Sequence, residues 1–151
     1  FTYWTQHCWG VTCVNDMEAM LSYQPITIGD KEQALADLVR CYEKMMMRSH
    51  TNGGYVNLLD ECWKMCEKFH TNIVIMYDHV SCKNVGGLHG LFEDQARERG
   101  IHLIWIPHDV MDPRTVSRRE MREAFSQYMV TVLNEKPLDP TLLDYEDTLS
   151  W

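Results

Sequence analysis

Two short apolar runs, separated by a helical pattern, constrain the fold of this chain most strongly. They cover residues 72–77 and 101–106 and are bounded by polar residues. Nearly continuous runs of this length are typical of strands buried on both faces of a parallel sheet. Between them, the sequence after Gly86-Gly87 carries apolar residues at helical spacing and ends at Gly100, a typical C-cap. A strand, a helix and a second strand in this order predict a parallel α/β sheet.

Patterns nearer the amino terminus extend this order. Residues 8–14 predict a short strand, because β-formers stand at most positions. A helical pattern begins at Lys31, with Asp30 as its expected N-cap, and residues 52–54 (Asn-Gly-Gly) interrupt it. A second amphipathic helix is expected from about Val56.

The last helix has the clearest signals in the chain. Ser117 and Glu120 stand three apart, as in a capping box, and apolar residues then recur every three or four positions toward Pro137. The whole order is strand, helix, helix, strand, helix, strand, helix, which predicts a doubly wound parallel sheet. We expect one α/β domain over residues 1–137 and an acidic tail over 138–151 that covers a surface or a partner.

Bulk properties exclude some function classes. The formal net charge of −8 argues against a nucleic-acid partner, which would need a positive surface. No apolar run is long enough to span a membrane. Six cysteines in a chain with 45% hydrophobic residues do not suggest a small disulfide scaffold, so we expect a reducing, cytoplasmic setting. Because the chain begins with Phe1 and has no leader pattern, we expect a piece of a longer protein.

Sites on parallel α/β sheets lie at the carboxyl ends of the strands, which directs attention to Cys82. This residue follows the first buried run and precedes a helix. The amides and dipole of a helix N-terminus would stabilise a thiolate there, and Lys83 adds a positive charge. Cys82 could therefore ligate iron or act as a nucleophile. An ordinary loop residue remains the alternative.

A second loop, residues 108–115, follows the next strand and should lie beside the Cys82 loop. Within it, Asp112-Pro113-Arg114 could fix the loop shape, with Arg114 pairing a carboxylate or a phosphate. A simple turn between a strand and a helix explains the same residues.

The remaining cysteines and methionines fit structural roles better than chemical ones. Cys62 and Cys66 share one helical face, which the helix also needs for packing. Cys8 and Cys13 would point to opposite faces of the expected strand. The run Met45-Met46-Met47 is expected to fill a core. The chain has no phosphate-binding glycine loop and no paired-histidine zinc motif.

Several short motifs occur together in one order from Asp30 to Leu133. They are Ser81-Cys82-Lys83, Glu98-Arg99-Gly100-Ile101, Asp112-Pro113-Arg114 with Ser117, and a final helix with Arg122, Phe125 and Tyr128-Met129. In this order the stretch resembles the carboxy-terminal domain of the 2-hydroxyacyl-CoA dehydratase subunits, a family that includes ATP-dependent benzoyl-CoA reductases. Residues 108–118 and the acidic tail look closest to a benzoyl-CoA reductase subunit. Dehydratase members commonly have Arg before the Ser-Cys pair and Pro-Tyr after the Lys, where this chain has Val80 and Asn84-Val85.

The resemblance implies a fold and a metal ligand. Subunits of this family fold as two flavodoxin-like domains and hold a 4Fe-4S cluster through three cysteines, the last from the carboxy-terminal domain. That role carries over to Cys82, and the other two cysteine ligands would lie outside this chain. The chain also lacks the opening strand and helix that are usual for the domain, so the piece alone is expected to be inactive.

The implied function is that of an iron–sulfur subunit passing low-potential electrons to an aromatic acyl-CoA thioester. Its expected partners are a related large subunit and an activator that hydrolyses ATP, so ATP is not bound here. His79, His89 and His108 are proton-donor candidates by position. The alternatives are a 2-hydroxyacyl-CoA dehydratase subunit and a cluster-free flavodoxin-like interaction domain.

Overall fold

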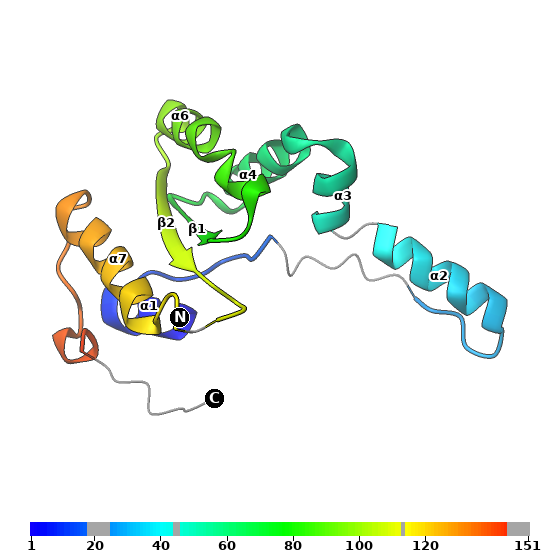
Figure 1. Ribbon diagram of the computed structural model, residues 1–151, viewed down its shortest axis with the longest axis horizontal. Helices are drawn as coiled ribbons and strands as arrows, with labels where there is room; N and C mark the ends of the chain where they lie inside the picture. The colour runs from blue at the N-terminus through cyan, green and yellow to red at the C-terminus, as the bar shows by residue number, and fades with distance from the viewer. Residues whose placement is uncertain (18–24, 44–45, 113, 145–151) are drawn as a thin grey trace. The chain divides into compact units, whose positions relative to one another are not determined.

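The computed structural model describes residues 1–17, 25–43, 46–112 and 114–144 (Figure 1). It separates into two compact units, one formed by residues 1–13 with the chain from residue 72 onward, the other by residues 14–71. The expected boundary at residue 137 stays a prediction. The Met45-Met46-Met47 run, expected to fill a core, lies outside the described residues and side chains.

The first unit contains a pair of parallel strands, β1 (Ile73–His79) and β2 (His102–His108). They pair from Ile73 opposite His102 to His79 opposite His108. This confirms the predicted parallel α/β class. Most of β1 is half-buried, and Tyr77 is 42% exposed. Burial on both faces was therefore wrong for β1, which pairs only with β2 among the described residues.

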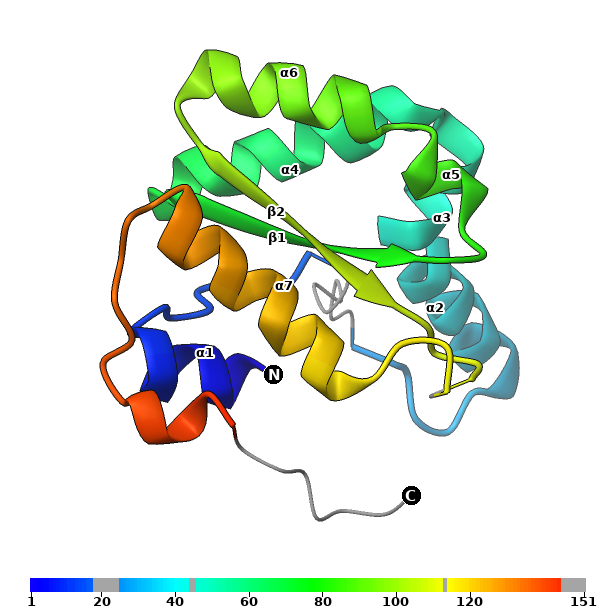
Figure 2. The same cartoon turned by 60° about the vertical axis from the view of Figure 1, so that its left-hand side comes forward.

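Helices lie on both sides of the strand pair. The chain leaves β1 through α5 (Lys83–Gly86) and α6 (His89–Arg99), and it leaves β2 into α7 (Arg118–Thr131). Figure 2 shows α6 on one side of the strands and α7 on the other. A local signal in the sequence sets the end of α6. Gly100 follows this helix in the left-handed conformation, at φ 66°.

The predicted capping box of α7 is confirmed. The Ser117 hydroxyl accepts from the Glu120 backbone N–H at 3.2 Å, and the Glu120 carboxylate accepts from the Ser117 backbone N–H at 2.6 Å. These bonds satisfy two amides that would otherwise lack partners at the helix start. The pKa of Glu120 is lowered by the bond that its carboxylate accepts from the Ser117 backbone and, next, by the bond that it accepts from the Ser117 hydroxyl at 2.9 Å.

The strand predicted over residues 8–14 is wrong. Residues 2–9 form a helix, α1 (Thr2–Trp9), and residues 10–14 form no strand. The buried residues Trp4, Thr5, Cys8 and Trp9 recur at helical spacing, and this periodicity outweighs the β-propensity of tryptophan and valine. Gly10, at φ 72°, ends the helix.

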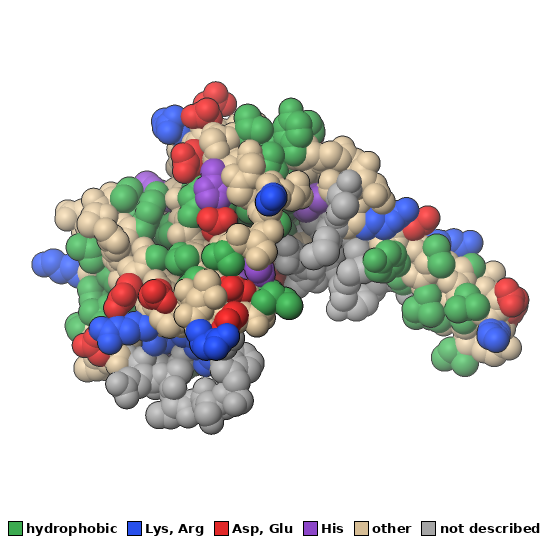
Figure 3. All heavy atoms as spheres, in the orientation of Figure 1, with side chains coloured by type: hydrophobic (Ala, Val, Ile, Leu, Met, Phe, Trp, Pro, Cys, Tyr) green, Lys and Arg blue, Asp and Glu red, His purple; other side chains and the backbone are tan. Residues whose placement is uncertain are grey.

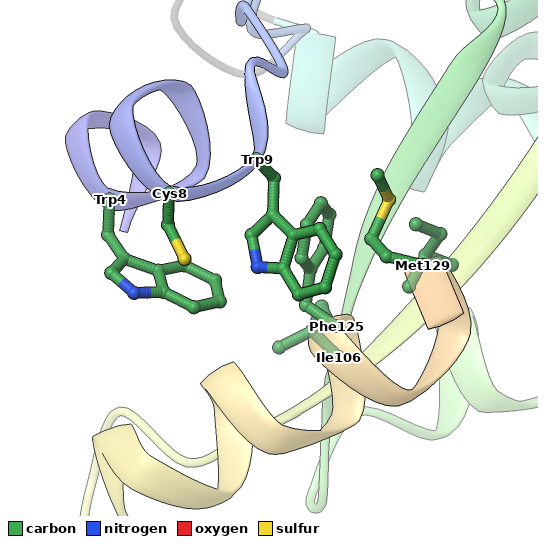
Figure 4. Close-up of a cluster of buried hydrophobic side chains, with 7 residues drawn as sticks. Trp4, Cys8, Trp9, Ile106, Phe125 and Met129 are labelled. Carbon is green, nitrogen blue, oxygen red and sulfur yellow. The ribbon is translucent and has the colours of Figure 1, made fainter. Parts of the chain in front are cut away.

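The core of the first unit joins α1 to β2 and α7. Trp4, Cys8 and Trp9 project from α1 toward Ile106 and Phe125, as Figure 4 shows. The Phe125 ring makes edge contacts with both Trp4 and Trp9, with ring centroids 5.8 and 6.4 Å apart. Such aromatic contacts add stabilisation beyond the buried area alone.

The segment after α7 returns to α1. The carbonyl of Cys8 accepts from the backbone N–H of Leu138 at 2.7 Å, and Trp4 Nε1 donates to the carbonyl of Leu142 at 2.9 Å. Leu142 ends a short 3-10 turn, Pro140–Leu142, which lies beside α1 (Figures 1 and 2). The described part of the tail thus covers this chain's own first helix.

The second unit contains three helices, α2 (Lys31–Glu43), α3 (Met46–Gly53) and α4 (Tyr55–Phe69). The Asp30 carboxylate accepts from the Gln33 backbone N–H at 3.1 Å, which confirms the predicted cap of α2. The break expected at residues 52–54 is confined to Gly54, at a φ of 80°, because Asn52 and Gly53 form the end of α3. In α4, Leu59, Trp63 and Cys66 are buried as expected.

We predict that Phe125→Ala lowers the free energy of unfolding by about 3–5 kcal/mol, because the ring is fully buried and the site cannot fully collapse around alanine. Urea unfolding followed by tryptophan fluorescence measures this change. The matched control is Val130→Ala on the same helix, where the side chain is 50% exposed and the loss should stay below about 0.5 kcal/mol. Equal losses in the two variants would contradict a core centred on Phe125.

Candidate functional site

The two predicted loops leave the same edge of the strand pair. Because β1 and β2 run parallel and in register, His79 and His108 stand side by side where the strands end. The Val80 backbone N–H donates to the carbonyl of His108 at 3.1 Å, so pairing continues by one residue into the first loop. The prediction that these loops are neighbours is confirmed.

Cys82 lies in the turn between β1 and α5. It is half-buried and stands at the N-cap of α5, which has only four residues. Its backbone N–H donates to the carbonyl of His79 at 2.8 Å, and its carbonyl accepts from the Gly86 N–H at 3.0 Å. The predicted position at the carboxyl edge of the strands is thus confirmed, whereas a role in binding iron stays a prediction.

His79 has a polar neighbour at each nitrogen of its ring. Its Nδ1 accepts from the Ser81 backbone N–H at 3.1 Å, and its Nε2 lies 4.0 Å from the Asp109 carboxylate. The His108 ring stands across it at 80°, with centroids 6.0 Å apart. From the sequence, His79 is expected only as a proton-donor candidate. The sequence did contain a signal for the contact with Asp109. His79 and His108 end the two strands, and parallel pairing places the residue after His108 beside His79.

His89 belongs to a different group of side chains. It stacks on Trp105 with ring centroids 3.7 Å apart, and its Nε2 lies 3.2 Å from the Asp78 carboxylate. The distance fits an ion pair, but the nitrogen has no hydrogen bond of acceptable geometry. Since Asp78 and His79 are adjacent in β1, their side chains point to opposite faces. The structure therefore brings His79 and His108 together and separates them from His89.

Asp109 holds the second loop in shape. Its carboxylate accepts from the backbone N–H of Met111 at 2.9 Å and of Asp112 at 3.2 Å. These bonds, led by that from Met111, lower the pKa of Asp109, and the nearby His79 lowers it further. A carboxylate that accepts backbone amides is favoured in its charged form. Asp109 is therefore a fixed negative charge at this edge.

Arg114 folds back onto its own loop. Its guanidinium donates to both oxygens of Asp112 at 2.9 and 2.7 Å, so it pairs a carboxylate, one of the two predicted partners. The pair lowers the pKa of Asp112. Pro113 lies outside the described residues. Figure 3 shows acidic and basic side chains gathered over the start of α7 and the segment that leads into it.

The other cysteines do not join this edge. Cys8 is buried in α1, where burial, and then Asp139, raise the pKa of its thiol, while Cys13 is exposed. The assumption that these two share a strand was wrong, because Cys8 is helical. Cys62 and Cys66 are buried in α4 of the second unit, as expected for packing residues.

A cavity of about 340 Å³ lies at the other end of the strand pair. Asn72, Ile73 and His102 line it at the starts of the strands, together with Trp9 and Met129. The cavity therefore lies at the opposite end of the strands from Cys82. The polar groups of the carboxyl edge do not line it.

The carboxyl edge offers one thiol to a metal. Within the described ranges, no three histidine, cysteine or acidic side chains are grouped so that they could hold a metal ion. Among the helices that the structure describes, none combines the length and apolar character needed to cross a membrane. Comparisons with protein-family models, curated proteins and solved structures found no match to this chain.

We predict that Asp109→Asn is less stable than the parent chain near neutral pH and that the gap closes in acid. The pKa of Asp109 is lowered in the folded chain, so its charge stabilises the fold fully above the ordinary carboxyl pKa of about 4. That stabilisation is lost as the pH falls through the lower folded value. Urea unfolding across this pH range measures the gap.

The control for this prediction is Asp94→Asn. It removes one negative charge from α6, where the side chain is 69% exposed. Its gap to the parent should remain small throughout the same range. A gap for Asp109→Asn that did not change with pH would show that its hydrogen bonds do not depend on its charge.

Proposed function

We propose that this chain is part of an iron–sulfur subunit of an ATP-dependent benzoyl-CoA reductase and that Cys82 is one ligand of its 4Fe-4S cluster. The observation that carries the proposal is the position of Cys82, a half-buried thiol in a hydrogen-bonded turn at the carboxyl edge of two parallel strands. The resemblance centred on Ser81-Cys82-Lys83 supports the same assignment. A flavodoxin-like arrangement and a cytoplasmic location belong to this proposal.

The donor chemistry fits the cluster in part. Clusters of this type are held by cysteine thiolates, and Cys82 can supply one of them. The described residues do not complete the set, since they contain no metal-binding group of three. The proposal therefore assigns the other two cysteines to a preceding domain. One thiolate from this chain and two from elsewhere would bind the cluster between two parts of the subunit.

The chain's own residues would serve the cluster by position and charge. The backbone bonds of the turn from His79 to Cys82 set the path of the chain at the thiol, and Asp109 places a negative charge 4.0 Å from the His79 ring. When bound, the cluster would supply low-potential electrons for an acyl-CoA thioester. A related large subunit would bind the substrate jointly with this one, and an ATP-hydrolysing activator would provide the electrons.

A cluster-free flavodoxin-like interaction domain is the second candidate. One observation favours it, namely that Cys82 has no thiol companion at its edge among the described residues. The two candidates differ in what Cys82 does. In the interaction domain the turn would keep its geometry and the thiol would be dispensable.

We predict that Cys82→Ser prevents stable cluster formation when the full-length subunit is reconstituted anaerobically with iron and sulfide. Loss of one of three thiolate ligands should remove most of the charge-transfer absorption and the bound iron. The matched control is Cys13→Ser, which changes an exposed cysteine of the same chain and should leave both readouts at the parent level. Undiminished absorption in Cys82→Ser would remove this residue from its proposed role.

We further predict that the purified complex, supplied with its activator and ATP, reduces benzoyl-CoA. The parallel assay uses a 2-hydroxyacyl-CoA under the same conditions. Turnover of the hydroxy compound alone would replace the reductase with the dehydratase, the other activity of the family. Turnover of neither compound by a cluster-loaded complex would contradict both.

A further inference from the structure

One side chain, His79, holds the turn that carries Cys82. The carbonyl of His79 accepts from the Cys82 backbone N–H at 2.8 Å, and its ring accepts from the Ser81 backbone N–H at 3.1 Å. The first bond needs only a backbone and would form with any residue. The second needs a ring nitrogen or another acceptor at the same place. The ring therefore adds a restraint that the turn alone does not provide.

The neighbouring strand orients this ring. Because Nδ1 accepts a hydrogen bond, the neutral ring carries its proton on Nε2, the nitrogen that faces Asp109. The separation of 4.0 Å is too long for a direct hydrogen bond, so the neutral ring is held toward Asp109 only by the attraction between its N–H dipole and the carboxylate charge. Two backbone amides fix Asp109 in turn, and the His108 ring limits rotation of His79 from the side.

We infer that His79 is the positioning residue for Cys82. The loop after β2 sets the ring through Asp109 and His108, the ring holds the Ser81 amide, and this amide fixes the direction of the chain at Cys82. The inference rests on the proposed function only for the identity of what the thiol binds. His79 acts through the turn and needs no contact with a substrate.

The test compares two replacements of His79 in the full chain. In His79→Asn the side-chain oxygen can take the place of Nδ1 as acceptor, whereas His79→Phe keeps a flat ring without an acceptor. Both retain the backbone carbonyl. The readouts are hydrogen exchange of the Ser81 amide and the rate of Cys82 alkylation by iodoacetamide, with exposed Cys13 in the same sample as reference.

We expect His79→Phe to raise both rates by about five-fold, the change in equilibrium constant that one net hydrogen bond typically contributes. His79→Asn should return both to within about two-fold of the parent, since the acceptor is restored. Unchanged rates in His79→Phe would overturn the inference. Equal effects of Asn and Phe would overturn it too, because they would show that the shape of the ring matters and its acceptor does not.

A measurement on the unaltered chain covers the case in which His79→Phe does not fold. In a ¹⁵N-labelled sample, an N–H···N hydrogen bond gives a scalar coupling between its two nitrogens. We expect a coupling between the Ser81 amide nitrogen and Nδ1 of His79. A folded sample in which both signals are resolved and uncoupled would contradict the inference.

Measurements with and without iron distinguish this inference from the proposed function. The exchange, alkylation and coupling readouts need no metal, so a cluster that survives Cys82→Ser would refute the proposed function and leave the turn geometry standing. In reconstituted full-length subunit, His79→Phe should incorporate less iron than His79→Asn. Equal iron in these two variants, with iron lost in Cys82→Ser, would refute the positioning role and support the ligand.

Discussion

The parallel, in-register pairing of β1 and β2 is the constraint on which the candidate site depends. It sets His79 opposite His108, and therefore brings the Cys82 turn next to the Asp109 loop. A shift of one residue would turn every side chain of one strand to the other face and separate these groups. The pairing is selected by the buried side chains of β2, since Leu103, Ile104 and Ile106 are all at most 9% exposed.

A second constraint is the aromatic cluster on the α7 face of the strands. Phe125 lies between the tryptophans of α1 and the β2 residue Ile106. α7 is also the helix that follows the Asp109 loop, so packing of Phe125 holds one end of that loop. The capping box at Ser117 holds the same end through hydrogen bonds. Packing and capping thus place the loop independently of each other.

Elements with strong local signals could be predicted from the sequence. The two apolar runs form parallel strands, although β1 is not buried on both faces, and the glycine that ends α6 and the capping box of α7 are as expected. The error at residues 8–14 came from using β-propensity and missing the helical period. The spacing of Trp4 and Cys8 is visible only when the residues before position 8 are included. Propensity is weak where tertiary packing decides, and this segment is helical because it packs against Phe125.

The site could be predicted only in outline. The rule that places sites at the carboxyl ends of strands located Cys82 and the Asp112–Arg114 loop correctly. The ring bond from Ser81 to His79 could not be predicted, because it depends on a side-chain rotamer set by residues of another strand. The same holds for α2, whose apolar residues Leu35, Leu38 and Tyr42 are exposed. Their periodicity indicates one helix face and does not identify what covers that face.

The contact between Cys8 and the segment at Leu138 and Asp139 has a consequence for synthesis on the ribosome. These residues stand about 130 positions apart, and the thiol of Cys8 also reaches the carbonyl of Asp139. In a nascent chain, α1 cannot complete its packing until Phe125 and then the tail have emerged. Trp4 and Trp9 stay exposed until then. Residues 14–71 can become compact in the meantime. α1 is translated before β1, β2 and α7 and is thus among the last elements of its unit to be completed, so its apolar face stays exposed in the interval.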